Sequence, residues 1–248
     1  MADILISVRN LTKSFGSDMI LDDISFDVTR GENLVVFGRS GTGKSVLLKC
    51  IIGLMEPDSG NIFIGDKNVW ELSLKELNKV RKRTSFLFQS AALYDSMTVS
   101  ENLEFHLDRN SNIERKNFKS KIEQTLEMVS LPGTLDKMPS ELSGGMRKRV
   151  GLARAIVTDP EIMFYDEPTT GLDPITAKEI SELIITLQKQ LNMTSIVVTH
   201  DLICAEIIAD RAIFLRDAKI MYEGTIETLI QSKDPFLKNF FSHEIIKP

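Results

Sequence analysis

A glycine-rich stretch at residues 38–45 carries the clearest chemistry in the sequence. It reads GRSGTGKS and fits the pattern G-x-x-x-x-G-K-[ST], in which glycines let backbone N–H groups turn towards phosphate oxygens. In that pattern Lys44 reaches the β- and γ-phosphates, and the Ser45 hydroxyl binds Mg²⁺. An apolar run, LVVF, precedes Gly38 and predicts a strand buried on both faces, followed by a helix from Lys44. The stretch therefore predicts a phosphate site.

Two acidic residues end a second apolar run, IMFYDE at residues 162–167. The carboxyl ends of strands in an open α/β sheet form the edge at which such folds bind ligands. Asp166 can hold hydrated Mg²⁺ there, and Glu167 can orient or deprotonate an attacking water. Surface Asp–Glu pairs are common, but Pro168 fixes the chain as it leaves the strand.

A second anion site is predicted at LSGGM, residues 142–146. Ser143 is a suitable N-cap, and Gly144 and Gly145 leave backbone donors uncovered at the start of a helix. One nucleotide needs only one phosphate cradle. We therefore expect this second cradle to serve a nucleotide held by another copy of the chain.

The elements that position these residues follow from the apolar patterns. Short β-rich runs in the first 35 residues predict antiparallel strands, and residues 98–159 are mostly helical, with one apolar face on the helix that contains Phe118, Ile122, Leu126 and Val129. The last third alternates strand, helix and strand, which predicts parallel pairing. The fold class is thus α/β, with a mostly parallel sheet, an N-terminal antiparallel β subdomain and an inserted α-helical subdomain.

The joint order of these motifs resembles the ATPase subunit of ABC transporters, the ATP-binding cassette family, from about Ile6 to Gly224. FLFQS with Gln89 is similar to the Q-loop, LSGGM to the signature, IMFYDE to the Walker B strand, and residues 170–173 (TGLD) to the D-loop. The resemblance implies a P-loop NTPase core and a single domain over residues 1–248. The helical insertion would occupy about 90–158, and a C-terminal tail about 225–248.

The resemblance also implies roles for individual residues. Glu167, His200 and Lys44 would be catalytic, and Mg²⁺ would be held by Ser45, Gln89 and Asp166. Phe15 would stack on adenine, although a strand-end Phe is also typical of a core. His200 would hydrogen-bond the γ-phosphate, and Asp173 would lie across a dimer interface or simply start a helix. The residues expected to contact ATP are Phe15, Gly38, Ser40, Gly41, Thr42, Gly43, Lys44, Ser45, Val46, Gln89, Ser143, Gly144, Gly145 and Asp173.

Two departures from the family pattern narrow the resemblance. The signature usually ends in Gln but here ends in Met146, and Arg39 occupies the variable second position of the phosphate loop. A Met signature together with FLFQSAALYDSMTVSENL resembles the lipid-asymmetry (Mla-like) branch, whose ATPases work with Mce-type lipid-binding proteins. That resemblance implies phospholipid transport. An importer ATPase for amino acids or other small solutes, and a non-transport ATPase of DNA repair or translation, remain the alternatives.

Partners and location are expected on the same basis. We expect a homodimer around two ATP molecules, a membrane permease, and in the same complex an Mce-type protein and a small regulatory subunit, at the cytoplasmic face of the inner membrane. The permease would dock on residues 90–99, which include Leu93, Tyr94, Met97 and Val99. The apolar C-terminal residues Phe236, Leu237, Phe240 and Phe241 could pack on their own chain or on a partner, and a partner contact is slightly favoured.

Composition excludes other classes. Thirty basic against 35 acidic residues give a net charge of −5, which argues against a nucleic-acid-coating protein, and no apolar run approaches the roughly 20 residues that cross a bilayer. Cys50 and Cys204 suit buried thiols in a reducing compartment. The basic runs at 81–83 and 147–149 are interpreted as solvated helix faces. A P-loop GTPase would need Asn-Lys-x-Asp, but Asn78-Lys79 is followed by Val80 and Arg81.

Overall fold

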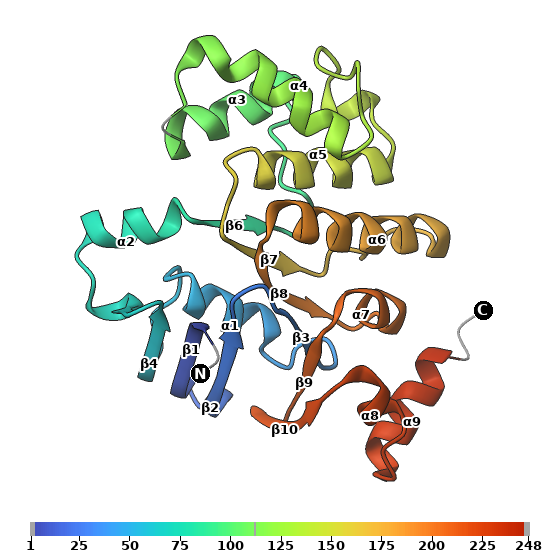
Figure 1. Cartoon of the computed structure of the whole chain (residues 1–248). Coiled ribbons are helices and arrows are strands. Elements are labelled where there is room, and N and C mark those ends of the chain that lie inside the picture. The colour runs from blue at the N-terminus through green and yellow to red at the C-terminus, as the bar shows by residue number, and fades with distance from the viewer. Residues whose placement is uncertain (1–2, 112, 246–248) are drawn as a thin grey trace. The chain divides into compact units, whose positions relative to one another are not determined.

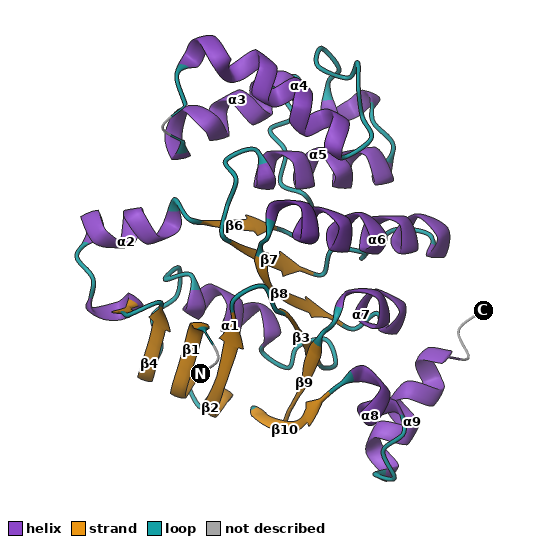
Figure 2. Cartoon of the chain, in the orientation of Figure 1, coloured by secondary structure: helices purple, strands orange, loops and turns teal. Residues whose placement is uncertain are grey.

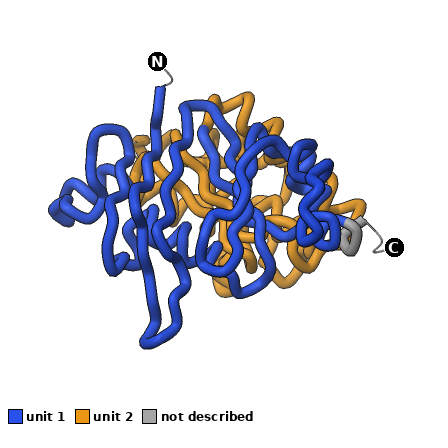
Figure 3. Tube along the Cα trace, turned by 90° about the horizontal axis from the view of Figure 1, so that it is seen from below, with its two compact units in different colours: residues 1–80, 194–248 blue, residues 81–193 orange. Residues whose placement is uncertain are grey.

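The structure, a computed structural model, describes residues 3–111 and 113–245. The chain divides into two compact units, shown in different colours in Figure 3: unit 1 comprises Met1–Val80 and Thr194–Pro248, and unit 2 comprises Arg81–Met193. The α/β class expected from the motifs is confirmed, and Figure 2 shows strands in both units and helices following them.

Unit 1 begins with the antiparallel sheet expected from the first residues. Its strand order is β2-β1-β4-β5. The strands are β1 (Ile4–Phe15), β2 (Asp18–Thr29), β4 (Ser59–Ile64) and β5 (Lys67–Asn68). The first two strands are 12 residues each, longer than the apolar runs within them, because Asn10 and Asp23 take left-handed backbone angles at register shifts and so interrupt the alternation without ending the pairing.

The second layer of strands in unit 1 surrounds β3 (Asn33–Phe37). This strand pairs in parallel with β8 (Thr194–Thr199) on one side and β9 (Arg211–Arg216) on the other, and β10 (Lys219–Gly224) pairs antiparallel with β9. All residues of β3 and β8 are buried. The continuous apolar run before the phosphate loop therefore forms the doubly covered strand that its composition predicts.

Helices complete unit 1 in Figure 1. They are α1 (Lys44–Ile51), α2 (Leu74–Arg81, which ends at the unit boundary), α7 (Leu202–Ile208), α8 (Ile226–Ile230) and α9 (Pro235–Ile245), with a 3-10 turn η1 (Val69–Glu71). Cys50 and Cys204 are both buried, as expected, and burial raises the pKa of Cys50 to about 11. Across the described residues we find no helix with both the length and the apolar character needed to span a bilayer.

Unit 2 combines one parallel strand pair with a group of helices. Strand β6 (Thr84–Leu87) pairs in parallel with β7 (Ile162–Asp166). The helices are α3 (Val99–Asn110), α4 (Phe118–Met128), α5 (Gly144–Ile156) and α6 (Pro174–Leu191), with the 3-10 turns η2 (Arg115–Asn117) and η3 (Pro139–Glu141). The predicted apolar face of α4 is confirmed, because Phe118, Ile122, Leu126 and Val129 are all buried. Thr98 and Glu101 form a capping box that starts α3.

Candidate nucleotide site

The phosphate loop connects β3 to α1 in unit 1, and its shape depends on two glycines. A Cβ on Gly38 would stand 2.6 Å from the carbonyl oxygen of Leu215 in β9. Gly43 has a φ of 94°, and a Cβ there would stand 2.8 Å from Ile20. Larger residues would meet backbone or packed side chains at both places. The loop is therefore seated against β2 and β9 by close backbone approach.

Lys44 is folded back over this loop. Its side chain is only 5% exposed. Its Nζ donates to the carbonyl oxygens of Gly38 at 2.7 Å and Arg39 at 3.0 Å, and Thr42 Oγ1 also donates to Arg39 at 2.9 Å. The ammonium group is thus held against the backbone of the loop that precedes α1. This arrangement of fixed donors and one cation is suited to binding phosphate oxygens.

His200 follows the strand next to the phosphate loop. In the parallel pairing of β3 with β8, Phe37 lies opposite Thr199. Gly38 and His200 therefore follow directly after the carboxyl ends of two neighbouring strands of unit 1. Asp201 then caps α7 by accepting hydrogen bonds from Ile203 and Cys204. Phe15 ends β1 with 49% of its surface exposed, and Lys13 Nζ lies 5.6 Å from its ring centroid. An exposed ring is available for stacking, whereas a core ring would not be.

Unit 2 brings the acidic pair and Gln89 to one strand edge. Leu87 pairs with Tyr165 in the β6–β7 register, so Gln89 and the pair Asp166 and Glu167 follow neighbouring strand ends. Glu167 has a φ of 50°, a left-handed angle that is uncommon for non-glycine residues and that turns the chain sharply after β7. Thr170 Oγ1 donates to its carboxylate at 3.2 Å. The Glu167 carboxylate, positioned by this hydrogen bond next to Asp166, suits a site that binds a metal ion and orients or deprotonates a water.

The signature segment starts α5 as expected. Ser143 caps the helix by accepting from the backbone N–H of Met146 at 3.2 Å, and both Ser143 and Gly144 are exposed. Asp173 caps α6, since its carboxylate accepts from the backbone of Ile175 at 3.1 Å and of Thr176 at 3.0 Å. The hydrogen bonds from Thr176 lower the pKa of Asp173. The local helix-start interpretation of Asp173 is thus confirmed, and its role across an interface stays a prediction.

The predicted residues therefore fall into two groups. Unit 1 holds Phe15, residues 38–46 and His200, and unit 2 holds Gln89, residues 143–145, Asp166, Glu167 and Asp173. Within each unit the strand registers bring the phosphate-binding and acidic residues to carboxyl edges. Residues 21–170 match the family described as ABC transporter. The chain belongs to the ABC transporter ATPase family. It is accordingly an ATP-binding and ATP-hydrolysing cassette, as its phosphate loop and acidic strand end indicate.

Similarity to other proteins covers almost the whole chain. The Haemophilus influenzae protein named intermembrane phospholipid transport system ATP-binding protein MlaF is 41% identical over 240 residues, or 97% of this chain and 91% of its own length. The Mycobacterium leprae protein named probable ribonucleotide transport ATP-binding protein mkl is 40% identical over 245 residues, or 99% and 71%. A dimeric post-hydrolysis structure of the ATP-binding cassette MJ0796 with ADP and Pi shares 30% identity and a TM-score of 0.79, covering 89% of this chain and 98% of that one.

One residue of the cassette was interpreted wrongly from the sequence. Lys148 lies in the basic run 147–149, but its side chain is only 5% exposed. Its Nζ donates to the carbonyl oxygen of Gln89 at 2.5 Å and to that of Glu167 at 3.4 Å. The signature helix α5 therefore contacts the backbone of both residues. Run 81–83 fits the expectation better, because Lys82 and Arg83 are exposed and Arg83 pairs with Glu161.

Two further residues of α5 hold the loop after Gln89. Arg154 donates to the carbonyl oxygens of Ala92 at 2.6 Å and Ala91 at 2.9 Å, and burial lowers the pKa of this guanidinium. Both alanines have left-handed backbone angles. A Cβ on Gly151 would stand 2.8 Å from the Cβ of Ala91. The acceptors are backbone carbonyls, so the identity of the residues that carry them gives no signal in the sequence. Only the spacing of three residues between Gly151 and Arg154 could have indicated that both lie on one face of α5.

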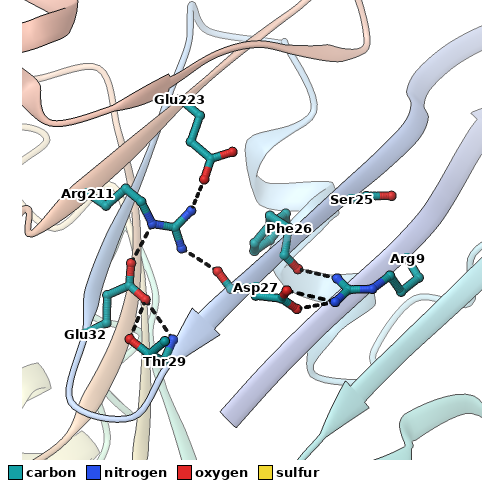
Figure 4. A pocket seen from close by; sticks show the side chains of 8 residues that line it. All are labelled: Arg9, Ser25, Phe26, Asp27, Thr29, Glu32, Arg211 and Glu223. Atoms are coloured by element: carbon teal, nitrogen blue, oxygen red, sulfur yellow. Dashed lines mark hydrogen bonds and ion pairs between the residues drawn. The ribbon is translucent and has the colours of Figure 1, made fainter. Parts of the chain in front are cut away.

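The cavity in Figure 4 has about 600 Å³ and lies in unit 1, and none of the predicted site residues lines it. Arg211 on β9 donates to Glu32 at 2.7 Å, to Glu223 on β10 and to the backbone carbonyl of Asp27 on β2. Arg9 on β1 pairs with the Asp27 carboxylate at 2.6 Å. These charges are engaged with one another across four strands. The polar side chains that line the cavity therefore join β1 and β2 to β9 and β10.

Proposed function

We propose that the chain is the ATPase subunit of a phospholipid-transporting ABC system. The observation that carries the proposal is the 41% identity to the MlaF protein of Haemophilus influenzae over 97% of the chain. A second MlaF protein, from Escherichia coli, is 39% identical over 236 residues. Each of these relatives is named for phospholipid transport. The Met146 signature and the segment after Gln89 support the same branch.

Within the proposed site, each residue has a chemical task. Lys44 and the loop N–H groups bind the β- and γ-phosphates, Glu167 orients or deprotonates the attacking water, and His200 hydrogen-bonds the γ-phosphate. Ser45, Gln89 and Asp166 offer hydroxyl, amide and carboxylate oxygens, the donor set that Mg²⁺ prefers alongside nucleotide phosphates and water. Mg²⁺ held by these residues would supply positive charge to offset that of the γ-phosphate. The protein supplies mainly positioning and electrostatic stabilisation.

The second phosphate cradle supports a homodimer. Ser143 and Gly144 are exposed at the start of α5, where backbone donors and the helix dipole favour an anion. We infer that this cradle closes over the ATP held by the phosphate loop of another copy. The MJ0796 cassette, described in its structure as dimeric, is a precedent for this assembly in a similar protein.

We propose that ATP turnover drives a membrane permease, and that the permease docks on a surface of unit 2. Tyr94 is 45% exposed and stacks edge-on against Phe105 at 5.0 Å. A cavity of about 460 Å³ is lined by Ser96, Met97, Glu101, Glu104, Phe105, Asp108 and Arg115. Val99, the first residue of α3, is fully buried. It therefore belongs to the core rather than to this surface. We propose that a permease helix docks here, at the cytoplasmic face of the membrane.

Cargo and partners can be tested together. We would tag the chain in its native host, isolate the intact complex and identify its proteins and bound lipids by mass spectrometry. A permease, an Mce-type protein, a small regulatory subunit and stoichiometric phospholipid are expected. A permease with a small-solute-binding protein and without lipid would overturn the phospholipid assignment. That result would favour a cargo such as the ribonucleotides named for the mkl relatives. Loss of permease capture on mutating both Leu93 and Tyr94 to Glu would locate the docking surface.

A further inference from the structure

The C-terminal helix α9 packs on the strands that carry the phosphate loop. Leu237, Phe240 and Phe241 are buried. The rings of Phe240 and Phe241 each lie edge-on to Phe37, with centroids 6.0 Å apart, and Phe37 is the residue directly before Gly38. The expected contact of this apolar cluster with a partner subunit is therefore wrong for the described residues. The cluster packs on its own chain because β3 and β9 present the complementary aromatic faces.

The same helix reaches the loop itself through Phe236. The guanidinium carbon of Arg39 lies 5.5 Å from the centroid of the Phe236 ring, and that of Arg216 on β9 lies 3.9 Å from it. Phe236 also lies edge-on to Phe214, with ring centroids 5.6 Å apart. One aromatic ring thus holds two cations, and one of these cations belongs to the second position of the phosphate loop.

The ring is held in place by the start of α9. Asp234 caps the helix by accepting from the backbone N–H of Phe236 at 2.8 Å and of Leu237 at 3.1 Å. The hydroxyl of Tyr222 on β10 donates to the same carboxylate, which raises the pKa of Tyr222. The position of Phe236 is therefore fixed both by packing and by a capped helix end tied to the sheet.

Arg39 matters because its carbonyl oxygen is an internal anchor of the loop. It accepts hydrogen bonds from Lys44 Nζ at 3.0 Å and from Thr42 Oγ1 at 2.9 Å. Holding the Arg39 side chain limits the conformations of the loop before ATP arrives. A preorganised loop loses less conformational entropy on binding, so the contact should favour ATP affinity and leave the chemical step alone.

We propose that Phe236 is a positioning residue for the phosphate loop, and that the C-terminal helix sets the ATP affinity of the cassette through the contact of Phe236 with Arg39. The proposal rests on the assignment of residues 38–45 as the ATP-phosphate site. It goes beyond that assignment by giving the C-terminal segment a role in nucleotide binding.

The test compares F236L, which keeps apolar packing but removes the aromatic face, with F236Y, which keeps the face. The full-length chain is used, and KM and kcat for ATP are measured together with the Kd of a fluorescent ATP analogue. We expect F236L to raise KM and Kd by about 2- to 5-fold, the effect of one exposed cation–π contact, with kcat unchanged. F236Y should restore the wild-type KM. R39A should match F236L, and the double variant should be no worse than either single variant.

Two results would overturn the proposal: an unchanged KM in F236L, whether or not kcat falls, or additive effects of F236L and R39A. K44A separates this failure from failure of the underlying site. If K44A abolishes ATP binding while F236L changes nothing, only the role of α9 is wrong. If K44A binds ATP normally, the phosphate-site assignment itself is wrong.

Discussion

The phosphate loop of unit 1 and the Gln89 loop of unit 2, residues 88–98, both follow a strand of a parallel pair, but different contacts hold them. The phosphate loop is seated by glycine close approaches to β2 and β9 and by the aromatic cluster behind Phe37. The Gln89 loop is held by charged side chains of α5, since Lys148 and Arg154 donate to its backbone carbonyls. Lys44 anchors the phosphate loop from within, so the two loops differ in what fixes them to neighbouring elements, which is close packing in one and charge-assisted hydrogen bonds from α5 in the other.

This difference suggests a division of labour in ATP turnover. A loop held by packing presents a constant phosphate site, so changes around it should affect ATP affinity. A loop held by single cations can change its conformation when one bond is exchanged, so changes there should affect the rate. We therefore expect substitutions around the phosphate loop of unit 1 to change KM, and substitutions around the Gln89 loop of unit 2 to change kcat.

The largest expected effect is that of K148M. Removing the ammonium takes this part-buried, charged donor away from the carbonyls of Gln89 and Glu167, at a cost of about 1–3 kcal/mol. We expect kcat to fall by roughly 10- to 100-fold while the ATP Kd stays at the wild-type value. K148R should recover part of the rate, and K82M, at an exposed lysine, should have no effect. A raised ATP Kd with a normal kcat would contradict the division of labour.

Unit 2 should also show the stronger pH dependence of stability. His106 on α3 is largely buried, and desolvation, with the nearby Arg154 charge, lowers its pKa to about 4 from 6.5. The unfolded chain then binds a proton between these values and the folded chain does not, so stability falls as pH drops below about 6.5. Urea unfolding should lose about 2 kcal/mol between pH 7.5 and pH 5 from this group. H106Q should flatten that slope, and an unchanged slope would show that His106 is not the group responsible.

A smaller effect is expected from G151A on the face of α5 that contacts the Gln89 loop. The added methyl would stand 2.8 Å from the Cβ of Ala91 and 3.1 Å from Leu87, so the helix or the loop must shift. We expect a loss of about 1 kcal/mol in the free energy of unfolding, measured by urea titration. Combining G151A with A91G removes the opposing methyl and relieves the left-handed angle at residue 91, so it should recover the loss. No recovery would place the clash elsewhere.

The sequence predicted the parts whose signals are local. The phosphate loop is a spaced motif, the buried β3 strand is a continuous apolar run, and the buried face of α4 follows helical periodicity from Phe118 to Val129. Each of these signals depends on neighbouring residues alone. The strand and helix on either side of the loop, the burial of β3 and the buried face of α4 were confirmed, and the phosphate contacts stay a prediction. The helix from Lys44 ends at Ile51, and Gly53 follows with a left-handed φ of 73°.

The unpredicted parts depend on contacts between distant segments. Lys148 looks like a surface lysine in the sequence because its acceptors are main-chain oxygens 59 and 19 residues away. The C-terminal aromatic cluster signals burial, but its composition cannot say which surface receives it. The strands β1 and β2 extend beyond their apolar runs because pairing continues through polar residues such as Asn10 and Asp23.

The central claim is that one copy's phosphate loop and another copy's signature enclose ATP, with Glu167 acting on the water. The most direct measurement is analytical ultracentrifugation of E167Q with and without Mg-ATP, beside an assay of phosphate release. We predict an ATP-dependent dimer that releases no measurable phosphate, and a monomer when S143R is added to block the second cradle. Normal hydrolysis by E167Q, or a dimer that forms equally well with S143R, would contradict the account.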